Sequence, residues 1–177
     1  DTDELARLIA RAAALTGVAY GSGEASDVSL RILAEHARTM TFLVSDGVFP
    51  SNEDRGYVLR RIMRRAVRHA YLLGVDEVVT PALVDEVVAI MGDDYPELRK
   101  NHDFVRGVVE REETRFRQTL KTGSVLLDEE LGALAPGGVL DGMRTSRWLL
   151  AVVVLVGGLL TGCAAGANPM MAPQPGP

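Results

Sequence analysis

The sequence predicts an all-α protein, a helical bundle with an arginine-rich helix and a long C-terminal helix. The first observation is that apolar residues recur at intervals of three and four through most of residues 1–134. The second is that strand signals are absent from this region. The third is that glycines stand where the periodicity stops, at Gly17, Gly47, Gly74 and Gly92.

Length and composition limit the possible functions. A chain of 177 residues is one domain by default and can bury a core. Its net charge of −5 means that nucleic-acid binding would need a local basic patch. The single cysteine, Cys163, excludes an intrachain disulfide and a cysteine zinc cluster. The chain starts at Asp1 without a methionine, and we therefore expect a fragment.

Two helices are predicted before residue 46. Asp3 can cap the first, and Gly17 is a natural stop. Its apolar positions are Leu5, Leu8, Ile9, Ala12 and Leu15. After a flexible linker over 18–24, Ser26 or Asp27 is expected to cap the second helix. Its buried positions are Leu30, Leu33, Ala34, Ala37, Thr41 and Val44, and Asp46-Gly47 ends it.

Three further segments complete the predicted bundle. Ser51 or Asn52 is suited to cap the arginine-rich helix, which Gly74 ends. A fourth helix is expected from Pro81 to Gly92. A long helix is expected from Pro96 to about residue 134, with Gly107 and Gly123 as points of bending or breakage.

The segment from Asp46 to His69 is the most informative part of the chain. At roughly 100° per residue, residues 58–68 separate into two halves. One half is apolar and contains Val58, Leu59, Ile62, Met63, Ala66 and Val67. The other contains Arg60, Arg61, Arg64, Arg65 and Arg68, and Arg55 precedes them.

Two interpretations of the arginine half stay open. One is a solvated face, as most charge runs are. The other is a surface for an external anion, because Arg60, Arg64 and Arg68, and likewise Arg61 and Arg65, repel one another at i,i+4. Guanidinium groups are bidentate donors suited to phosphate oxygens, and nucleic acid is therefore the obvious ligand.

Three sequence blocks carry a resemblance to a known family. The central block is DG at 46–47, PSNE at 50–53, RGYVLRR at 55–61 and RRAVRH at 64–69. The upstream block is LRILAEH at 30–36 with Arg38 and Phe42-Leu43. The downstream block is Glu112-Glu113, Phe116, Thr119-Leu120, Gly123, Leu126-Leu127 and Glu129-Glu130. Together they resemble the helical tRNA-recognition region of alanyl-tRNA synthetase over residues 1 to about 142, with Glu35 standing where Asp is expected.

The resemblance implies recognition of the acceptor stem of alanine tRNA through its G·U wobble pair. Asn52 matches the asparagine that contacts this pair, and its amide offers donors and an acceptor to the shallow minor groove. From the residues alone, Asn52 is equally a candidate helix cap. The arginines implied to hold the RNA backbone are Arg55, Arg60, Arg61, Arg64, Arg65 and Arg68. About half of these are expected to face RNA and the rest to pair with carboxylates.

The resemblance also implies what this chain lacks. The class II catalytic motifs, the zinc-binding editing site and a second base-pair reader do not occur in it. We therefore expect no catalytic residue and no cofactor here; ATP, Mg and Zn belong to the parent enzyme. His36, His69 and His102 have no ligand spacing, and no metal site is expected. The expected partners are the acceptor stem and the missing catalytic domain of the same enzyme, in the cytoplasm, with no stable membrane partner.

The sequence changes character after a loop over 135–142. Residues 143–163 resemble a bacterial lipoprotein signal peptide, in which Leu-Thr-Gly-Cys would be the lipobox and Cys163 the lipidated residue. The preferred explanation is a non-native junction at Met143 between two reading frames, followed by a disordered tail over 164–177. A C-terminal anchor and a packing helix are the alternatives for the apolar segment. The competing hypothesis for the whole chain is a truncated membrane lipoprotein with an accidental N-terminal fusion.

Overall fold

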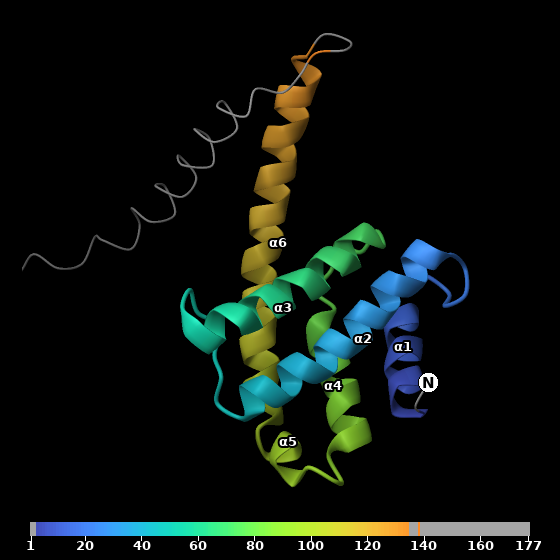
Figure 1. The fold of residues 1–177 in the computed structure, drawn as a ribbon, viewed down its shortest axis with the longest axis vertical. Helices are drawn as coiled ribbons and strands as arrows, with labels where there is room; N and C mark the ends of the chain where they lie inside the picture. Colours follow the sequence, from blue (N-terminus) through green and yellow to red (C-terminus); the bar gives the residue numbers. More distant parts are fainter. Residues whose placement is uncertain (1–2, 135–137, 139–177) are drawn as a thin grey trace, which may run out of the picture. The chain divides into compact units, whose positions relative to one another are not determined.

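Figure 1 shows a computed structural model of the protein, which describes residues 3–134 and 138. These residues contain helices and no strand, and the predicted all-α fold is confirmed. The helices are α1 (Asp3–Thr16), α2 (Glu24–Ser45), α3 (Asp54–Leu72), α4 (Thr80–Met91), α5 (Pro96–Lys100) and α6 (His102–Gly132). The chain divides into two compact units, residues 1–124 and 125–177, and the hydrophobic core lies in the first.

Helices α1 and α2 pack through the apolar positions that the sequence predicts. Leu8 and Ala12 of α1 and Leu30 and Leu33 of α2 are fully buried. Helix α1 stops before Gly17, whose φ of +70° is a conformation that side chains with a Cβ disfavour. The predicted end of the first helix is therefore confirmed.

The start of α2 differs from the prediction. The helix begins at Glu24, with Gly23 preceding it and no side-chain cap. The Asp27 carboxylate accepts a hydrogen bond from the Gly21 N–H at 2.7 Å, and the Ser26 hydroxyl donates to the Gly23 carbonyl at 2.8 Å. Both side chains thus hydrogen-bond to the turn that precedes α2. A cap at Ser26 or Asp27 would start the helix after those residues, but α2 already begins at Glu24.

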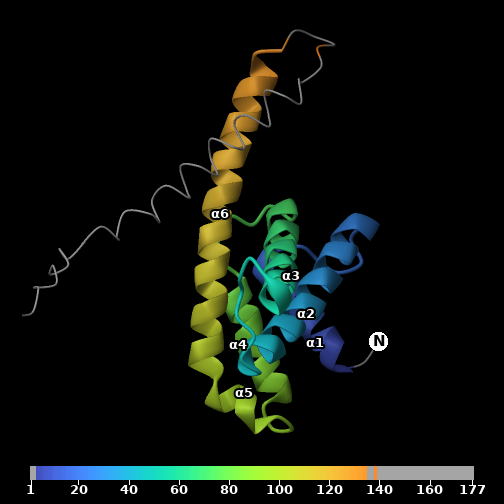
Figure 2. The same cartoon turned by 60° about the vertical axis from the view of Figure 1, so that its left-hand side comes forward.

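Helices α2 and α3 lie side by side, as Figures 1 and 2 show, and make the most extensive contact among the helix pairs of the described region. Helix α2 ends where the Asp46-Gly47 pair predicts. Gly47 has a φ of +84°, and the Val48 N–H bonds back to the Leu43 carbonyl at 2.9 Å. This reversal starts the turn that leads into α3.

Helix α4 is the most apolar of the helices and fills the centre of the first unit. Leu83, Val84 and Val87 are fully buried, and the helix contacts α1, α2 and α5. It begins at Thr80, one residue before the Pro81 expected from the sequence. Proline is tolerated there because a first-turn N–H has no partner within the helix.

The prediction of a single long helix from Pro96 is wrong. The segment forms the short α5 and the long α6, with a break at Asn101. The Asn101 amide donates to the Ser45 hydroxyl at 3.1 Å and to the Ser45 carbonyl at 3.3 Å. This contact with the end of α2 fixes the break. Gly107 and Gly123, the positions suspected from the sequence, lie inside a continuous α6.

The predictions for the C-terminal part fall outside the described residues. These are the apolar segment over 143–163, the tail over 164–177 and lipidation of Cys163. In the second unit, the described end of α6 carries Val125, Leu127 and Leu131, each about half exposed. Within residues 3–134, no helix is long and apolar enough to cross a membrane.

Candidate nucleic-acid interface

The turn between α2 and α3 is built around a buried glycine. The Ser51 N–H bonds to the Gly56 carbonyl at 3.1 Å, and the Ser51 hydroxyl donates to the Glu53 carbonyl at 2.7 Å. A Cβ at Gly56 would lie 2.3 Å from both the Phe49 carbonyl oxygen and the Ser51 hydroxyl oxygen. Only glycine therefore allows α3 to approach this turn so closely.

Asn52 projects from this turn and does not cap α3. The residue preceding α3 is Glu53, and no side chain caps the helix, so the predicted cap at Ser51 or Asn52 is wrong. Asn52 is exposed, and its Oδ1 accepts a hydrogen bond from Nη1 of Arg60. The same guanidinium donates through Nη2 to the Pro50 carbonyl at 3.1 Å. Arg60 thus ties the turn to the second turn of α3.

The arginine half of α3 splits into two groups with different surroundings. Arg60 and Arg64 turn towards Glu112 of α6, a carboxylate with only 5% of its side chain exposed. Arg64 Nε donates to Glu112 Oε1 at 3.0 Å, and its guanidinium lies over the Phe116 ring. Arg60 Nε lies 3.3 Å from the same oxygen, an ionic contact without hydrogen-bond geometry.

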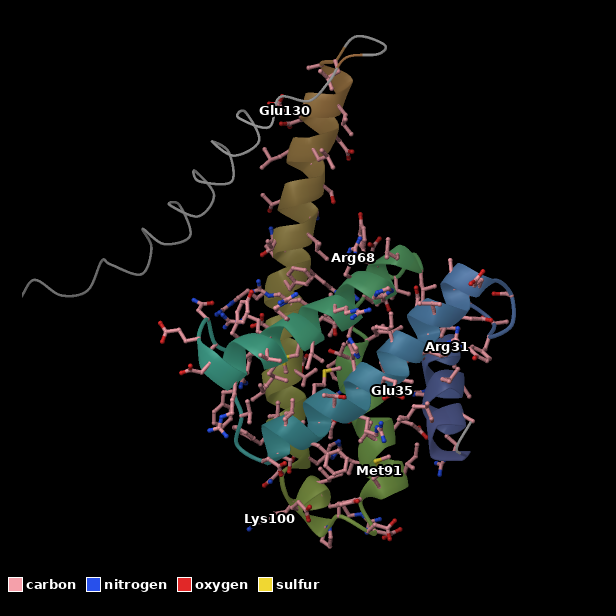
Figure 3. All side chains as sticks on the ribbon, viewed as in Figure 1. Arg31, Glu35, Arg68, Met91, Lys100 and Glu130 are labelled. Carbon is pink, nitrogen blue, oxygen red and sulfur yellow. The ribbon has the colours of Figure 1, made fainter. Side chains whose placement is uncertain are left out.

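Arg55, Arg61, Arg65 and Arg68 are exposed. Within residues 3–134 they form no ion pair with an acidic side chain. Arg61, Arg65 and Arg68 follow one another at i,i+4 and i,i+3 and therefore share one face of α3. Figure 3 labels Arg68 towards the end of α3, and Arg31 and Glu35 on the adjacent α2. Glu35 pairs with Arg38 of its own helix at 3.0 Å.

The apolar half of α3 is buried less uniformly than its periodicity predicts. Leu59, Met63, Ala66 and Val67 are buried, but Val58 is 55% exposed. Tyr57 is 47% exposed and lies under the Arg61 guanidinium, 5.8 Å from it. Phe49, half exposed, packs edge-on against Phe104 of α6. Tyr57 is therefore an exposed aromatic side chain beside the arginine face.

The turn and the start of α3 line an open surface hollow of about 800 Å³. It is lined by Gly47, Val48, Phe49, Ser51, Asn52, Glu53, Asp54, Arg55 and Gly56. Asp54 begins α3 with a φ of +51°, a left-handed conformation that is uncommon outside glycine. The hollow places Asn52 and Arg55 beside each other at the end of the arginine face.

Two histidines lie beside the exposed arginines. Burial lowers the pKa of His36 on α2, and the charges of Arg65 and His69 lower it further. Burial likewise lowers the pKa of His69, followed by the charges of Arg65 and Arg68. His69 Nδ1 also lies 3.0 Å from the Ser29 hydroxyl. His102 instead contacts the Asp85 carboxylate at 2.7 Å.

The roles of Glu112 and Glu113 are not predicted by the sequence pattern. The two side chains point to different partners. Glu112 pairs with α3, whereas the buried Glu113 pairs with Arg117 and with the start of α4. Their burial could have been predicted from the helical period, because both glutamates continue the buried stripe of Val105, Val108 and Val109 on α6.

No cluster of three or more metal-ligating side chains occurs in residues 3–134. The exposed arginine face, with Asn52 at its end, has chemistry suited to a polyanion.

The chain is similar to proteins of known class. Residues 1–148 match the family described as tRNA synthetases class II (A), and the chain belongs to this family. Its similarity within the family is to alanine–tRNA ligases, which confirms the resemblance seen in the sequence.

Individual relatives show how far the similarity extends. The chain is 53% identical over 142 residues to the alanine–tRNA ligase of Acidithiobacillus ferridurans, which is 80% of this chain and 16% of that protein. It is 51% identical over 142 residues to that of Caulobacter vibrioides, again 80% and 16%. It is 51% identical over 129 residues to the alanine–tRNA ligase of Thermotoga maritima, and this match covers 73% of this chain and 15% of that protein. The chain thus spans about a sixth of these relatives.

Proposed function

We propose that residues 1–142 recognise the acceptor stem of alanine tRNA during ATP-dependent alanylation. The supporting observation is the exposed row of Arg61, Arg65 and Arg68, which lacks acidic partners in residues 3–134 and has Asn52 beyond its N-terminal end. The relatives are named alanine–tRNA ligases, and the chain corresponds to a sixth of their length. We propose that the catalytic domain of the same enzyme is the second partner and the cytoplasm the location.

The arginines and Asn52 have different tasks in this proposal. Arg55, Arg61, Arg65 and Arg68 contact phosphates, which contributes affinity and register without sequence information. Arg60 and Arg64 are engaged by Glu112 and contribute less to phosphate binding. Asn52 reads the G·U pair from the minor groove, where an amide distinguishes base edges by hydrogen bonds.

A binding comparison tests this proposal. The full chain is titrated, at low salt, with an acceptor-stem minihelix that carries the G·U pair and with one that carries G·C. We expect both RNAs to bind and the G·U helix to bind more tightly by about two- to tenfold, the contribution of one hydrogen bond. Absence of binding to either RNA would contradict RNA recognition, and equal binding would contradict the role of Asn52.

A further inference from the structure

The Asn52 amide has only one possible orientation in this structure. A guanidinium carries five N–H donors and no acceptor. The amide atom that faces Arg60 must therefore be the oxygen, and Oδ1 is the atom that accepts from Arg60 Nη1. Asn52 Nδ2 has no hydrogen-bond partner within residues 3–134, and the residue is exposed. The amide thus presents a donor to its surroundings.

Arg60 is itself held from three sides. Its Nη2 donates to the Pro50 carbonyl at 3.1 Å, and its Nε lies 3.3 Å from the buried Glu112 carboxylate. Only 15% of the Arg60 side chain is exposed. Glu112 comes from α6, 52 residues beyond Arg60, so the tertiary fold places this arginine.

We propose that Arg60, held by Glu112, is a positioning residue that binds the amide oxygen of Asn52 and leaves Nδ2 as the group that contacts RNA. The proposal rests on the proposed function for its RNA ligand. In the minor groove, a fixed donor selects an acceptor, such as a pyrimidine O2, a purine N3 or a 2′-hydroxyl oxygen. Arg60 therefore acts on selectivity, whereas the exposed arginines act on affinity.

Three variants separate positioning from phosphate binding, each measured as the G·U to G·C ratio of minihelix affinities. Arg60→Lys keeps the charge but cannot reach three partners, and we expect the ratio to fall to about one. Asn52→Asp keeps the contact to Arg60 and removes the donor, with the same expected loss. Arg61→Met, the matched control, weakens both RNAs equally. An unchanged ratio in Arg60→Lys would overturn the proposal.

Glu112→Gln is expected to change affinity and selectivity in opposite directions, which a merely structural role of Glu112 would not do. Loss of this carboxylate frees Arg60 and Arg64 from their acidic partner and adds net positive charge. We expect tighter binding of both minihelices together with a lower G·U to G·C ratio. An increase in affinity with an unchanged ratio would contradict the positioning role, as would loss of affinity for both minihelices in a folded variant.

A measurement without RNA separates this proposal from the proposed function. In the free chain, the {¹H}–¹⁵N NOE of the Asn52 side-chain amide reports its order on the ps–ns timescale. We expect a high value in the native chain and a clear fall in Arg60→Lys and Glu112→Gln. If the native chain does not distinguish the two minihelices, the proposed function fails, and this NOE still decides whether Arg60 positions Asn52. An NOE that does not change in Arg60→Lys would refute the positioning.

Discussion

Glu113 of α6 accepts a hydrogen bond from the backbone N–H of Thr80, at 2.8 Å, and another from the Thr80 hydroxyl. The same carboxylate accepts from the Val79 N–H at 3.2 Å and pairs with Arg117. The Arg117 guanidinium reaches on to the Val75 carbonyl at 2.8 Å. A side chain of α6 thus satisfies the free N–H groups at the start of α4, where no local residue does so.

Removal of this carboxylate should destabilise the fold. Glu113→Ala leaves Arg117 without its partner in a buried site and leaves the first N–H groups of α4 unsatisfied. We expect the free energy of unfolding to fall by about 3–5 kcal/mol in chemical denaturation. The control is Glu110→Ala on the exposed side of the same helix, expected to change it by less than about 0.5 kcal/mol. Similar values for the two variants would contradict the role of Glu113.

The turn that carries Asn52 should not tolerate a side chain at Gly56. In Gly56→Ala, the new Cβ would lie 2.3 Å from the Phe49 carbonyl oxygen. We expect a loss of about 1–3 kcal/mol of unfolding free energy and loss of G·U selectivity. Gly123→Ala is the matched control, because its Cβ meets nothing within 4 Å inside α6, and it should stabilise by about 0.5–1 kcal/mol. Tolerance of Gly56→Ala would contradict the close packing described.

Stability should depend on pH through His36 and His69. The folded pKa of each lies below its ordinary value of 6.5, so the unfolded chain binds more protons in this range. Stability is therefore fully present above 6.5 and falls as the pH drops towards the folded pKa values. Denaturation curves between about pH 7.5 and about pH 5.5 measure this slope. We expect a smaller slope in His36→Gln/His69→Gln, and an identical slope would contradict the assignment.

RNA binding should raise the pKa values of His36 and His69, which the fold lowers. The positive charge of Arg65 contributes to the low pKa of both, and a bound phosphate offsets that charge. We expect NMR titration of the imidazole resonances to give higher pKa values in the minihelix complex than in the free chain. Unchanged values for His36 and His69 would place the RNA elsewhere.

The sequence was sufficient for features that depend on local chemistry. Gly17, Gly47 and Gly74 end helices, and each has a positive φ that the glycine signal anticipates. The apolar stripes of α1, α2 and α4 likewise identify core residues, because burial follows the helical period. The position of Asn101 carried no comparable signal, because its break depends on a hydrogen bond to Ser45 at the end of another helix.

The division of the arginine row shows the same limit at the candidate site. Helical spacing places Arg60, Arg64 and Arg68 in one i,i+4 series and Arg61 and Arg65 in another, and Arg68 lies close to both. It does not indicate which arginines face α6, because that depends on where Glu112 packs against α3. Tertiary packing therefore decides which arginines have an acidic partner and which stay exposed.

The most direct test of the RNA surface is a pair of charge reversals with equal effect on net charge. Arg65→Glu/Arg68→Glu alters the exposed face of α3, and Arg11→Glu/Lys100→Glu alters exposed residues of α1 and α5. Figure 3 shows Arg68 and Lys100 at opposite sides of the first unit. We expect the first variant to abolish minihelix binding at low salt and the second to retain most of it. Equal losses in the two variants would contradict a localised RNA site on α3.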